Sequence, residues 1–266
     1  MKASPPTLRD SRRLRRECAN IIIDLHRNVS AGHISSSLCI SDILIFLHFY
    51  VMNKQDTFIL SKGHSALALY SILFALGKIS KKLFETCYQD GTLLGAHPPC
   101  GLNKVPGILF GTGSLGHGLS LAAGVALSNK LKGRRGVTYC LISDGECDEG
   151  SIWEAALFAG HHQLKNLVVI IDDNGMQALG KTSEVLNLEP LDEKWRSFGF
   201  DVAITDGHDI SGLQKTLARL SQSSKPQCII AKTHPLISFM KKELRWHYTP
   251  FTEGEYAAAK EEINAM

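Results

Sequence analysis

The sequence predicts an α/β fold, a doubly wound parallel sheet flanked by helices, and three observations support it. Segments with strand and helix patterns alternate from residue 137 to residue 231, which is typical of parallel sheets with right-handed crossovers. The strand segments at 167–172 and 228–231 are almost continuously apolar, as expected for strands covered on both faces. Neither an internal repeat nor a Ser/Gly-rich linker divides the chain. We therefore expect one domain over residues 1–266, with a helical N-terminal segment at about 7–52.

The first half of the chain is predicted to be mainly helical. Within residues 7–28, apolar side chains recur at intervals of three and four, so one face of a helix is apolar and the other solvated. Residues 35–37 are small, so the backbone there could approach a ligand, whereas 91–118 is rich in glycine and proline and is expected to be irregular. Further helices are predicted at about 41–52, 65–76 and 116–131, and a short apolar run lies at 57–60.

The second half alternates strands and helices. The stretch at 233–250 shows neither pattern and precedes a short C-terminal helix. The predicted strands are 137–142, 167–172, 200–204 and 228–231, and the predicted helices are 149–162, 192–198 and 210–220.

Composition indicates a globular protein and excludes several classes. Hydrophobic residues make up 44% of the 266 residues and charged residues 21%, which leaves enough apolar mass for a sizeable core. The net charge of +3 is too small to predict nucleic-acid binding. No apolar stretch approaches the roughly 18 residues that cross a membrane, the N-terminus lacks the apolar core of a signal peptide, and the seven cysteines form no C-x-x-C pair. We expect a reduced, cytoplasmic protein that binds neither nucleic acid nor membrane.

Polar residues follow two strands of the predicted sheet, at the ends where open parallel sheets bind ligands. Asp144 and Gly145 follow the strand at 137–142, and Asn174 follows the strand at 167–172. If these strands are neighbours, a carboxylate and an amide oxygen lie side by side, and Mg²⁺ could complete this ligand set with phosphate oxygens and water. Gly145 and the N-terminus of the next helix would accommodate the phosphate. The alternative is that both segments are ordinary turns.

Residues 111–116 match the dinucleotide-binding pattern G-x-G-x-x-G, but the rest of such a site is missing. No Asp or Glu occurs from Gly91 to Ser143, so no carboxylate there could bind a ribose. Only Arg134 and Arg135 would suit a 2′-phosphate. We therefore expect no dinucleotide site.

Histidines at loop positions are candidates for binding or catalysis. His33, His64 and His97 each stand beside a glycine or proline at a predicted break, and the alternative for each is a surface or structural histidine. An acidic cluster is predicted to be a solvated helix start, where the helix dipole favours negative charge. It comprises Glu146, Asp148, Glu149 and Glu154.

Taken together, these segments resemble the N-terminal half of transketolase. Ser143-Asp144-Gly145, 27 further residues (146–172) and then Asp173-Asn174 are similar to the thiamine-diphosphate motif of a Gly-Asp-Gly and an Asn-Asn at that spacing. The likeness extends through SAGHISSSL, LSKGHSALALY, GAHPP, TGSLGHGLSLAAGVAL and RWH, in the family's order and over roughly residues 10–250. Ser143 and Asp173 replace the first Gly and the first Asn of the motif, and His117 stands where the family usually carries Gln.

The resemblance implies thiamine diphosphate and Mg²⁺ as cofactors. It assigns Asp144, Asn174 and the carbonyl of Met176 to the metal. It assigns Gly145, His64 and His247 to the diphosphate.

The resemblance also assigns residues to the reacting part of the site. Leu115 and Gly116 would approach the aminopyrimidine through backbone atoms. His33, His97 and His247 would serve catalysis, by proton transfer and by polarising the carbonyl of the substrate. Glu149 and Glu154 would belong to a carboxylate network at a subunit interface beside the cofactor.

The length of the chain points to a split transketolase. The family's second domain, which binds the aminopyrimidine, and its usual C-terminal domain do not fit within 266 residues. The resemblance therefore implies a partner subunit that carries both, an α₂β₂ tetramer, and a chain that is inactive alone. The pair would transfer a two-carbon ketol unit from a ketose to an aldose, with sugars or sugar phosphates as substrates.

Two other interpretations stay open. The chain could be a subunit of another thiamine-diphosphate enzyme, of the 2-oxo acid dehydrogenase or deoxyxylulose phosphate synthase type, although several loop histidines suit a polyhydroxylated ketose better than pyruvate. It could also be a non-catalytic binding subunit. The presence of Asp144, Asn174, His33 and His97 argues against that interpretation.

Overall fold

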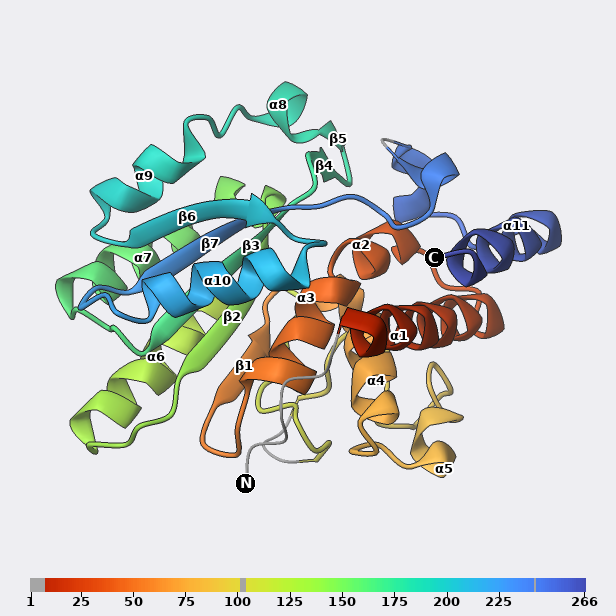
Figure 1. The fold of residues 1–266 in the computed structure, drawn as a ribbon, viewed down its shortest axis with the longest axis horizontal. Helices are drawn as coiled ribbons and strands as arrows, with labels where there is room; N and C mark the ends of the chain where they lie inside the picture. Colours follow the sequence, from red (N-terminus) through yellow and green to blue (C-terminus); the bar gives the residue numbers. More distant parts are fainter. Residues whose placement is uncertain (1–7, 101–103, 242) are drawn as a thin grey trace.

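A computed structural model describes residues 8–100, 104–241 and 243–266 and confirms the predicted fold class (Figure 1). Its centre is a five-stranded parallel sheet with the strand order β1-β2-β3-β7-β6. These strands are β1 (Thr57–Leu60), β2 (Thr138–Ser143), β3 (Leu167–Asp173), β6 (Asp201–Asp206) and β7 (Gln227–Lys232). A short antiparallel ribbon of β4 (Met176–Gln177) and β5 (Gly180–Lys181) follows β3.

Helices cover both faces of the sheet, because successive residues of a strand point to opposite sides. In β2, Tyr139 and Leu141 pack into one hydrophobic core, whereas Cys140 and Ile142 pack into a second core on the other side. Figure 1 shows α10 in front of the sheet and α6 and α7 behind it. Burial on both sides explains why the sequences of β2 and β3 are almost continuously apolar.

The two helical layers are made of different parts of the chain. On the first face lie α1 (Leu8–Asn28), α2 (Ile34–Cys39), α3 (Ser41–Ile45), a π-helical turn (Phe46–Val51), α4 (Ala66–Ala75), α10 (Ile210–Leu220) and α11 (Glu253–Asn264). On the second face lie α6 (Gly118–Leu131), α7 (Gly150–His161) and α9 (Leu191–Ser197). The short helices α5 (Lys81–Phe84) and α8 (Thr182–Val185) lie in the connecting loops.

The predicted helices and strands are confirmed with shifts at their ends, and the helix predicted at about 41–52 divides into α3 and the π-helical turn. The apolar run at 57–60 is β1, an edge strand that pairs with β2. Residues 35–37, the stretch of small residues, lie inside α2. The predicted helix at 116–131 begins at Gly118, because Gly116 has a φ of +83° and cannot continue a right-handed helix.

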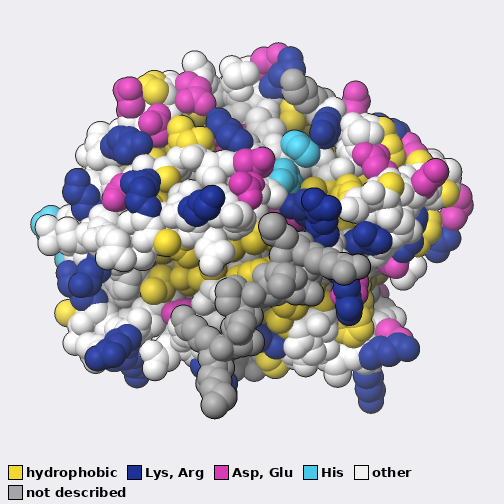
Figure 2. All heavy atoms as spheres, viewed as in Figure 1, with side chains coloured by type: hydrophobic (Ala, Val, Ile, Leu, Met, Phe, Trp, Pro, Cys, Tyr) yellow, Lys and Arg dark blue, Asp and Glu magenta, His cyan; other side chains and the backbone are white. Residues whose placement is uncertain are grey.

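The surface carries charges of both signs. Figure 2 shows cationic and acidic side chains interspersed over one face, in keeping with the net charge of +3. Across the described residues, none of the helices has the length and apolar character needed to span a membrane. Residues 1–7, which include the start of the predicted first helix, lie outside the described residues.

Candidate functional site

The ends of β2 and β3 bring Asp144 and Asn174 onto neighbouring turns. The two strands are paired in parallel, so both residues leave the sheet at the same edge. The buried carboxylate of Asp144 accepts hydrogen bonds from the backbone N–H groups of Gly145 and Gly175, each at 2.9 Å. It also accepts the Thr182 hydroxyl at 2.8 Å. The carboxylate therefore lies beside the turn that carries Asn174.

Asn174 and Met176 lie together on that turn. Nδ2 of Asn174 donates to Oδ2 of Asp172 at 2.9 Å, and Oδ1 of Asn174 accepts the backbone N–H of Met176 at 2.9 Å. Burial and then the charge of Asp172 raise the pKa of Asp144 to about 7. The described part of the chain contains no group of three or more His, Cys, Asp or Glu side chains that could hold a metal. A cation bound here thus needs further oxygen ligands, such as phosphate and water.

Three histidines form a cluster near these turns. The ring centroid of His33 lies 4.9 Å from that of His64 and 6.0 Å from that of His247. The backbone N–H of His33 donates to the carbonyl of His247 at 3.1 Å. Gly32 permits this approach, because a Cβ at residue 32 would lie 2.9 Å from the carbonyl oxygen of His247. Burial lowers the pKa of all three histidines, to about 4 for His33, so the rings are neutral at pH 7.

His97 lies on the exposed side of this cluster. Its ring packs on Gly113, where a Cβ would lie 3.2 Å from Cδ2 of His97. Its carbonyl accepts the hydroxyl of Tyr70 at 2.8 Å, which anchors the loop. His97 is also close enough to the cluster for its charge to lower the pKa of His33 and His64. The four loop histidines therefore surround one region.

A cavity of about 270 Å³ lies between the Asn174 turn, α2 and His247. Asn174, Met176, His247 and Ser35 are among its lining residues. The hydroxyl of Ser35 and the Nδ1 atoms of His33 and His247 are buried with no hydrogen-bond partner among the described residues. Buried polar atoms normally find partners, so these atoms indicate a site for polar ligand groups or water.

A larger groove lies elsewhere on the molecule. It has a volume of about 920 Å³, runs between α6 and the β1 edge of the sheet, and has none of the predicted site residues in its lining. We therefore identify the site by its polar groups and not by its size.

Glu146 holds the turn before α6 against the end of β2. Its fully buried carboxylate accepts the Ser61 hydroxyl (2.5 Å), the Gly116 N–H (2.9 Å) and the Ser143 N–H (3.0 Å). The prediction that Glu146 belongs to a solvated helix start is wrong, because these three donors compensate the buried charge. The Gly116 N–H is thus already used, and its carbonyl accepts the Ser151 hydroxyl at 3.0 Å. One lone pair of that carbonyl is left for a ligand.

Leu115, Glu149 and Glu154 are the remaining predicted site residues. Leu115 is half-buried beside Gly116. Glu149 is exposed, and its Cβ would lie 2.8 Å from a Cβ built at Gly116. Glu154 is exposed further along α7, on the helix that also exposes Leu157 and Phe158. The structure therefore places Glu149 beside the Gly116 turn and Glu154 on an open helix surface.

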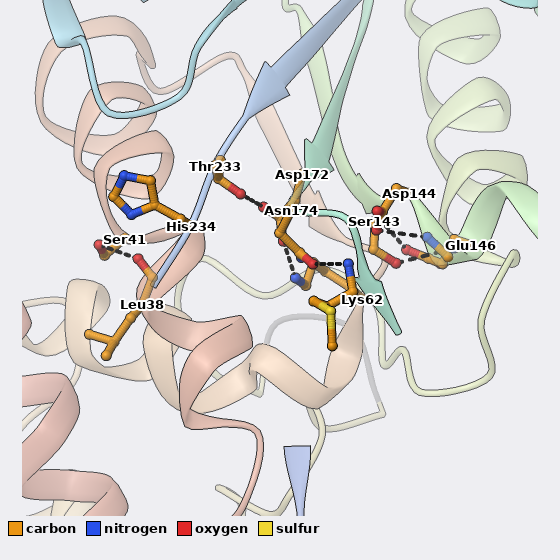
Figure 3. A network of polar contacts seen from close by, with 12 residues as sticks. Leu38, Ser41, Lys62, Ser143, Asp144, Glu146, Asp172, Asn174, Thr233 and His234 are labelled. Atoms are coloured by element: carbon orange, nitrogen blue, oxygen red, sulfur yellow. Dashed lines mark hydrogen bonds and ion pairs between the residues drawn. The ribbon is translucent and has the colours of Figure 1, made fainter. Parts of the chain in front are cut away.

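Two charged residues that the sequence analysis missed meet beside Asn174 (Figure 3). Lys62, from the loop after β1, forms an ion pair with Asp172 near the end of β3, and the two side chains are 1% and 0% exposed. Thr233, which follows β7, donates to the same carboxylate. The sequence could have pointed to these two residues by their position, because each stands at the end of an apolar strand, at the edge of the sheet where ligands bind.

Comparison with known proteins gives the family to which a chain with this fold and site belongs. The family model described as "Transketolase, thiamine diphosphate binding domain" matches residues 20–264. The chain belongs to the transketolase family. It is 36% identical over 255 residues to a protein of Phocaeicola vulgatus that is named as one of the subunits of an apulose-4-phosphate transketolase, with 91% of this chain and 90% of that protein covered. It is 37% identical over 247 residues to "6-deoxy-6-sulfo-D-fructose transketolase subunit SqwG" of a Clostridium species, with coverages of 88% and 89%.

Solved transketolases share the fold over almost the whole chain. The transketolase of Leishmania mexicana superposes with a TM-score of 0.88 at 25% identity, covering 98% of this chain and 42% of that chain. The transketolase of Campylobacter jejuni gives a TM-score of 0.86 at 28% identity, covering 95% and 43%. The chain thus spans about two fifths of the length of these transketolases. It corresponds to their thiamine diphosphate-binding domain.

Proposed function

We propose that this chain is the diphosphate- and Mg²⁺-binding subunit of a two-chain transketolase that moves a two-carbon ketol unit from a ketose to an aldose. The observation that carries the proposal is the meeting of Asp144 and Asn174 at neighbouring strand ends, beside a cavity with unpartnered polar atoms. Two relatives of similar length are named as transketolase subunits, which supports a partner chain. That partner would carry the pyrimidine-binding and C-terminal domains, and the assembly would be α₂β₂.

The residues present fit Mg²⁺ and a diphosphate. The carboxylate of Asp144, the amide oxygen of Asn174 and the carbonyl of Met176 are hard oxygen ligands of the kind that Mg²⁺ prefers. Gly145, His64 and His247 would contact the diphosphate, and the unpartnered Nδ1 of His247 supports this role. When bound, thiamine diphosphate supplies the carbanion chemistry that ketol transfer requires.

The histidines would bind the substrate and move protons. His33 is neutral at pH 7, because its pKa is about 4, and its Nδ1 atom has no partner in the described chain. It can therefore accept a proton or a hydrogen bond from a sugar hydroxyl. His97, on the exposed side, would orient the incoming sugar. His247 would serve both the diphosphate and the reacting carbonyl.

The remaining assigned residues would face the aminopyrimidine and the partner chain. Leu115 and the free lone pair of the Gly116 carbonyl would approach the aminopyrimidine. Glu149, beside Gly116, and Glu154, exposed on α7, would lie in the subunit interface.

Reconstitution tests the proposal. The chain and the C-terminal transketolase subunit of the same organism, mixed with thiamine diphosphate and Mg²⁺, should transfer ketol units, and each chain alone should be inactive. The donors to compare are xylulose 5-phosphate, apulose 4-phosphate, 6-deoxy-6-sulfo-D-fructose and pyruvate; the second and third come from the names of the relatives.

Each alternative predicts a different result. Turnover of pyruvate with no ketose turnover would indicate a 2-oxo acid dehydrogenase or a deoxyxylulose phosphate synthase type. Unchanged activity of the pair carrying Asp144→Ala would indicate a non-catalytic subunit. Full activity of the isolated chain would refute the two-chain arrangement.

A further inference from the structure

Lys62 and Asp172 form a buried ion pair that reaches across the end of the sheet. Lys62 follows β1 and Asp172 lies near the end of β3, and β2 separates these two strands. Taking two charges out of water is costly unless each has good partners. A buried pair at the ligand-binding edge therefore suggests a role in the site as well as in stability.

Three donors from three segments hold the carboxylate of Asp172. Oδ2 accepts the ammonium of Lys62 and, at 2.9 Å, Nδ2 of Asn174. Oδ1 accepts the hydroxyl of Thr233. Figure 3 shows these three side chains grouped around Asp172. With both oxygens bonded in different directions, the carboxylate cannot rotate freely.

This arrangement decides which way the amide of Asn174 faces. The carboxylate of Asp172 accepts every hydrogen bond made to it, from Lys62, Thr233 and Asn174, so the amide turns its nitrogen toward Asp172. Its oxygen then faces the other way, where it accepts the N–H of Met176 at 2.9 Å. A flipped amide would set oxygen against oxygen at Asp172 and N–H against N–H at Met176. A cation can be bound only by the oxygen of an amide.

We propose that Lys62 and Asp172 are positioning residues that fix the amide oxygen of Asn174 toward Mg²⁺ without touching the ion. Asp172 orients the amide through the hydrogen bond from Nδ2 of Asn174, and the ion pair with Lys62 holds the carboxylate of Asp172 in place. The positive charge of Lys62 also offsets the negative charge of Asp172, which would otherwise be a second unpaired buried carboxylate near Asp144. This inference rests on the proposed function, because it concerns the same metal site.

The test measures the Mg²⁺ concentration that gives half-maximal thiamine diphosphate binding, by calorimetry on the reconstituted two-chain enzyme. Asp172→Asn should raise this concentration by ~10- to 100-fold, the usual effect of changing a group that orients a metal ligand. Saturating Mg²⁺ should restore full binding of thiamine diphosphate, because the ligand oxygens are still present.

Folding of the variants is controlled separately. Lys62→Met alone leaves a buried carboxylate unpaired, so the double variant Lys62→Met/Asp172→Asn removes both charges and should show the same Mg²⁺ defect. The matched controls are Asp173→Asn and Lys232→Met. These residues form the neighbouring, more exposed ion pair on β3 and β7, and their variants should change the Mg²⁺ requirement less than ~2-fold.

The outcomes separate this inference from the proposed function. If the wild-type pair shows no Mg²⁺-dependent binding of thiamine diphosphate, the proposed function fails and this inference fails with it. If the wild-type pair binds and Asp172→Asn has the same Mg²⁺ requirement, only the positioning role is overturned. A defect that saturating Mg²⁺ does not restore would also overturn it, because such a defect indicates general damage.

Discussion

The backbone N–H of Gly116 donates to the carboxylate of Glu146 at 2.9 Å, across 30 residues of sequence. The Ser61 hydroxyl donates to the same carboxylate at 2.5 Å and accepts the N–H of Gly118 at 3.1 Å. One buried carboxylate therefore ties together the segment after β1, the end of β2 and the start of α6. These three segments frame the site, so its geometry depends on Glu146.

Glu146→Ala should destabilise the chain strongly. The substitution leaves the Ser61 hydroxyl and the N–H groups of Gly116 and Ser143 without their acceptor in a buried region. An unsatisfied buried donor costs about 1–3 kcal/mol, and three donors lose their acceptor, so we expect a loss of ~3 kcal/mol or more in the free energy of unfolding. Urea unfolding at pH 7.5 measures it. Glu154→Ala, at an exposed position on α7, should stay within ~0.5 kcal/mol of wild type, and a similar change in both variants would contradict the role of Glu146.

Gly116→Ala should be destabilising for two reasons that can be separated. The φ of +83° disfavours any residue with a Cβ by ~1–2 kcal/mol, and the added Cβ would lie 2.4 Å from Oγ of Ser151. Adding Ser151→Ala should relieve the contact with Oγ, but neither the strain at φ nor the 2.8 Å approach to Cβ of Glu149. Denaturant unfolding of the single and double variants should therefore show partial recovery. Strict additivity would show that the contact is unimportant.

A glycine in the adjacent helix provides the control for this prediction. A Cβ at Gly124, within α6, would meet no atom within 4 Å. Gly124→Ala should stabilise the chain by ~0.5–1 kcal/mol, because alanine loses less backbone freedom in a helix.

The strand ends could be predicted from the sequence because they depend on local pattern. Asp144 and Asn174 follow apolar runs that are buried as strands in the sheet, and the carboxyl ends of parallel strands share one edge. The run at 57–60 is harder to assign, because four residues are too few to show a periodicity that separates a strand from a helix. In the structure this run pairs in parallel with β2 and is therefore a strand.

The buried charges could not be predicted in this way. Lysine, glutamate and aspartate are rarely buried, so Lys62, Glu146 and Asp172 each suggest an exposed side chain when met in the sequence. What makes their burial possible is a partner far along the chain, 85 residues away for the Ser61–Glu146 bond and 110 residues away for the Lys62–Asp172 pair. Such partners come together only when the chain folds, so local sequence patterns do not reveal them.

His48→Leu should weaken the pH dependence of stability. His48 is buried, both its ring nitrogens lack partners in the described chain, and burial lowers its pKa to about 3. The unfolded chain, with a histidine pKa of about 6.5, takes up the proton first as the pH falls, so stability decreases from pH 6.5 toward pH 3. At pH 5 this costs the wild type ~2 kcal/mol, which the leucine variant should not lose.

The measurement compares the free energy of unfolding at pH 7.5 and pH 5. The difference between these pH values should shrink by ~2 kcal/mol in His48→Leu. At pH 7.5 the variant should be at least as stable as wild type, because two unsatisfied polar atoms are removed. His161→Leu, at an exposed position on α7, is the control. If the free energy of unfolding of His48→Leu changed between pH 7.5 and pH 5 as much as that of wild type, the ring of His48 would not be the cause of the pH dependence.

Asp144→Asn should affect stability and metal binding in opposite directions. The carboxylate of Asp144 is 2% exposed and lies near a second buried carboxylate, Asp172. Without a cation, removing one of these charges should stabilise the chain by ~1 kcal/mol or more. The asparagine oxygen can still accept the Gly175 N–H and the Thr182 hydroxyl, so the turn should stay in place. Its NH₂ group replaces the oxygen that accepts the Gly145 N–H, and the loss of this bond reduces the gain in stability. Because a neutral amide is a weaker ligand than a carboxylate, the Mg²⁺ affinity of the reconstituted pair should fall by ~100-fold.

Thermal unfolding with and without thiamine diphosphate and Mg²⁺ separates these two effects. The wild-type pair should gain stability that rises with the logarithm of the ligand concentration relative to Kd, whereas the Asp144→Asn pair should start from a higher melting temperature and gain little. Asp173→Asn, on the adjacent residue of β3, should behave like wild type in its response to the ligands. If Asp144→Asn instead lowered the melting temperature of the ligand-free protein and kept the full ligand response, the carboxylate would be a structural group and the metal would bind elsewhere.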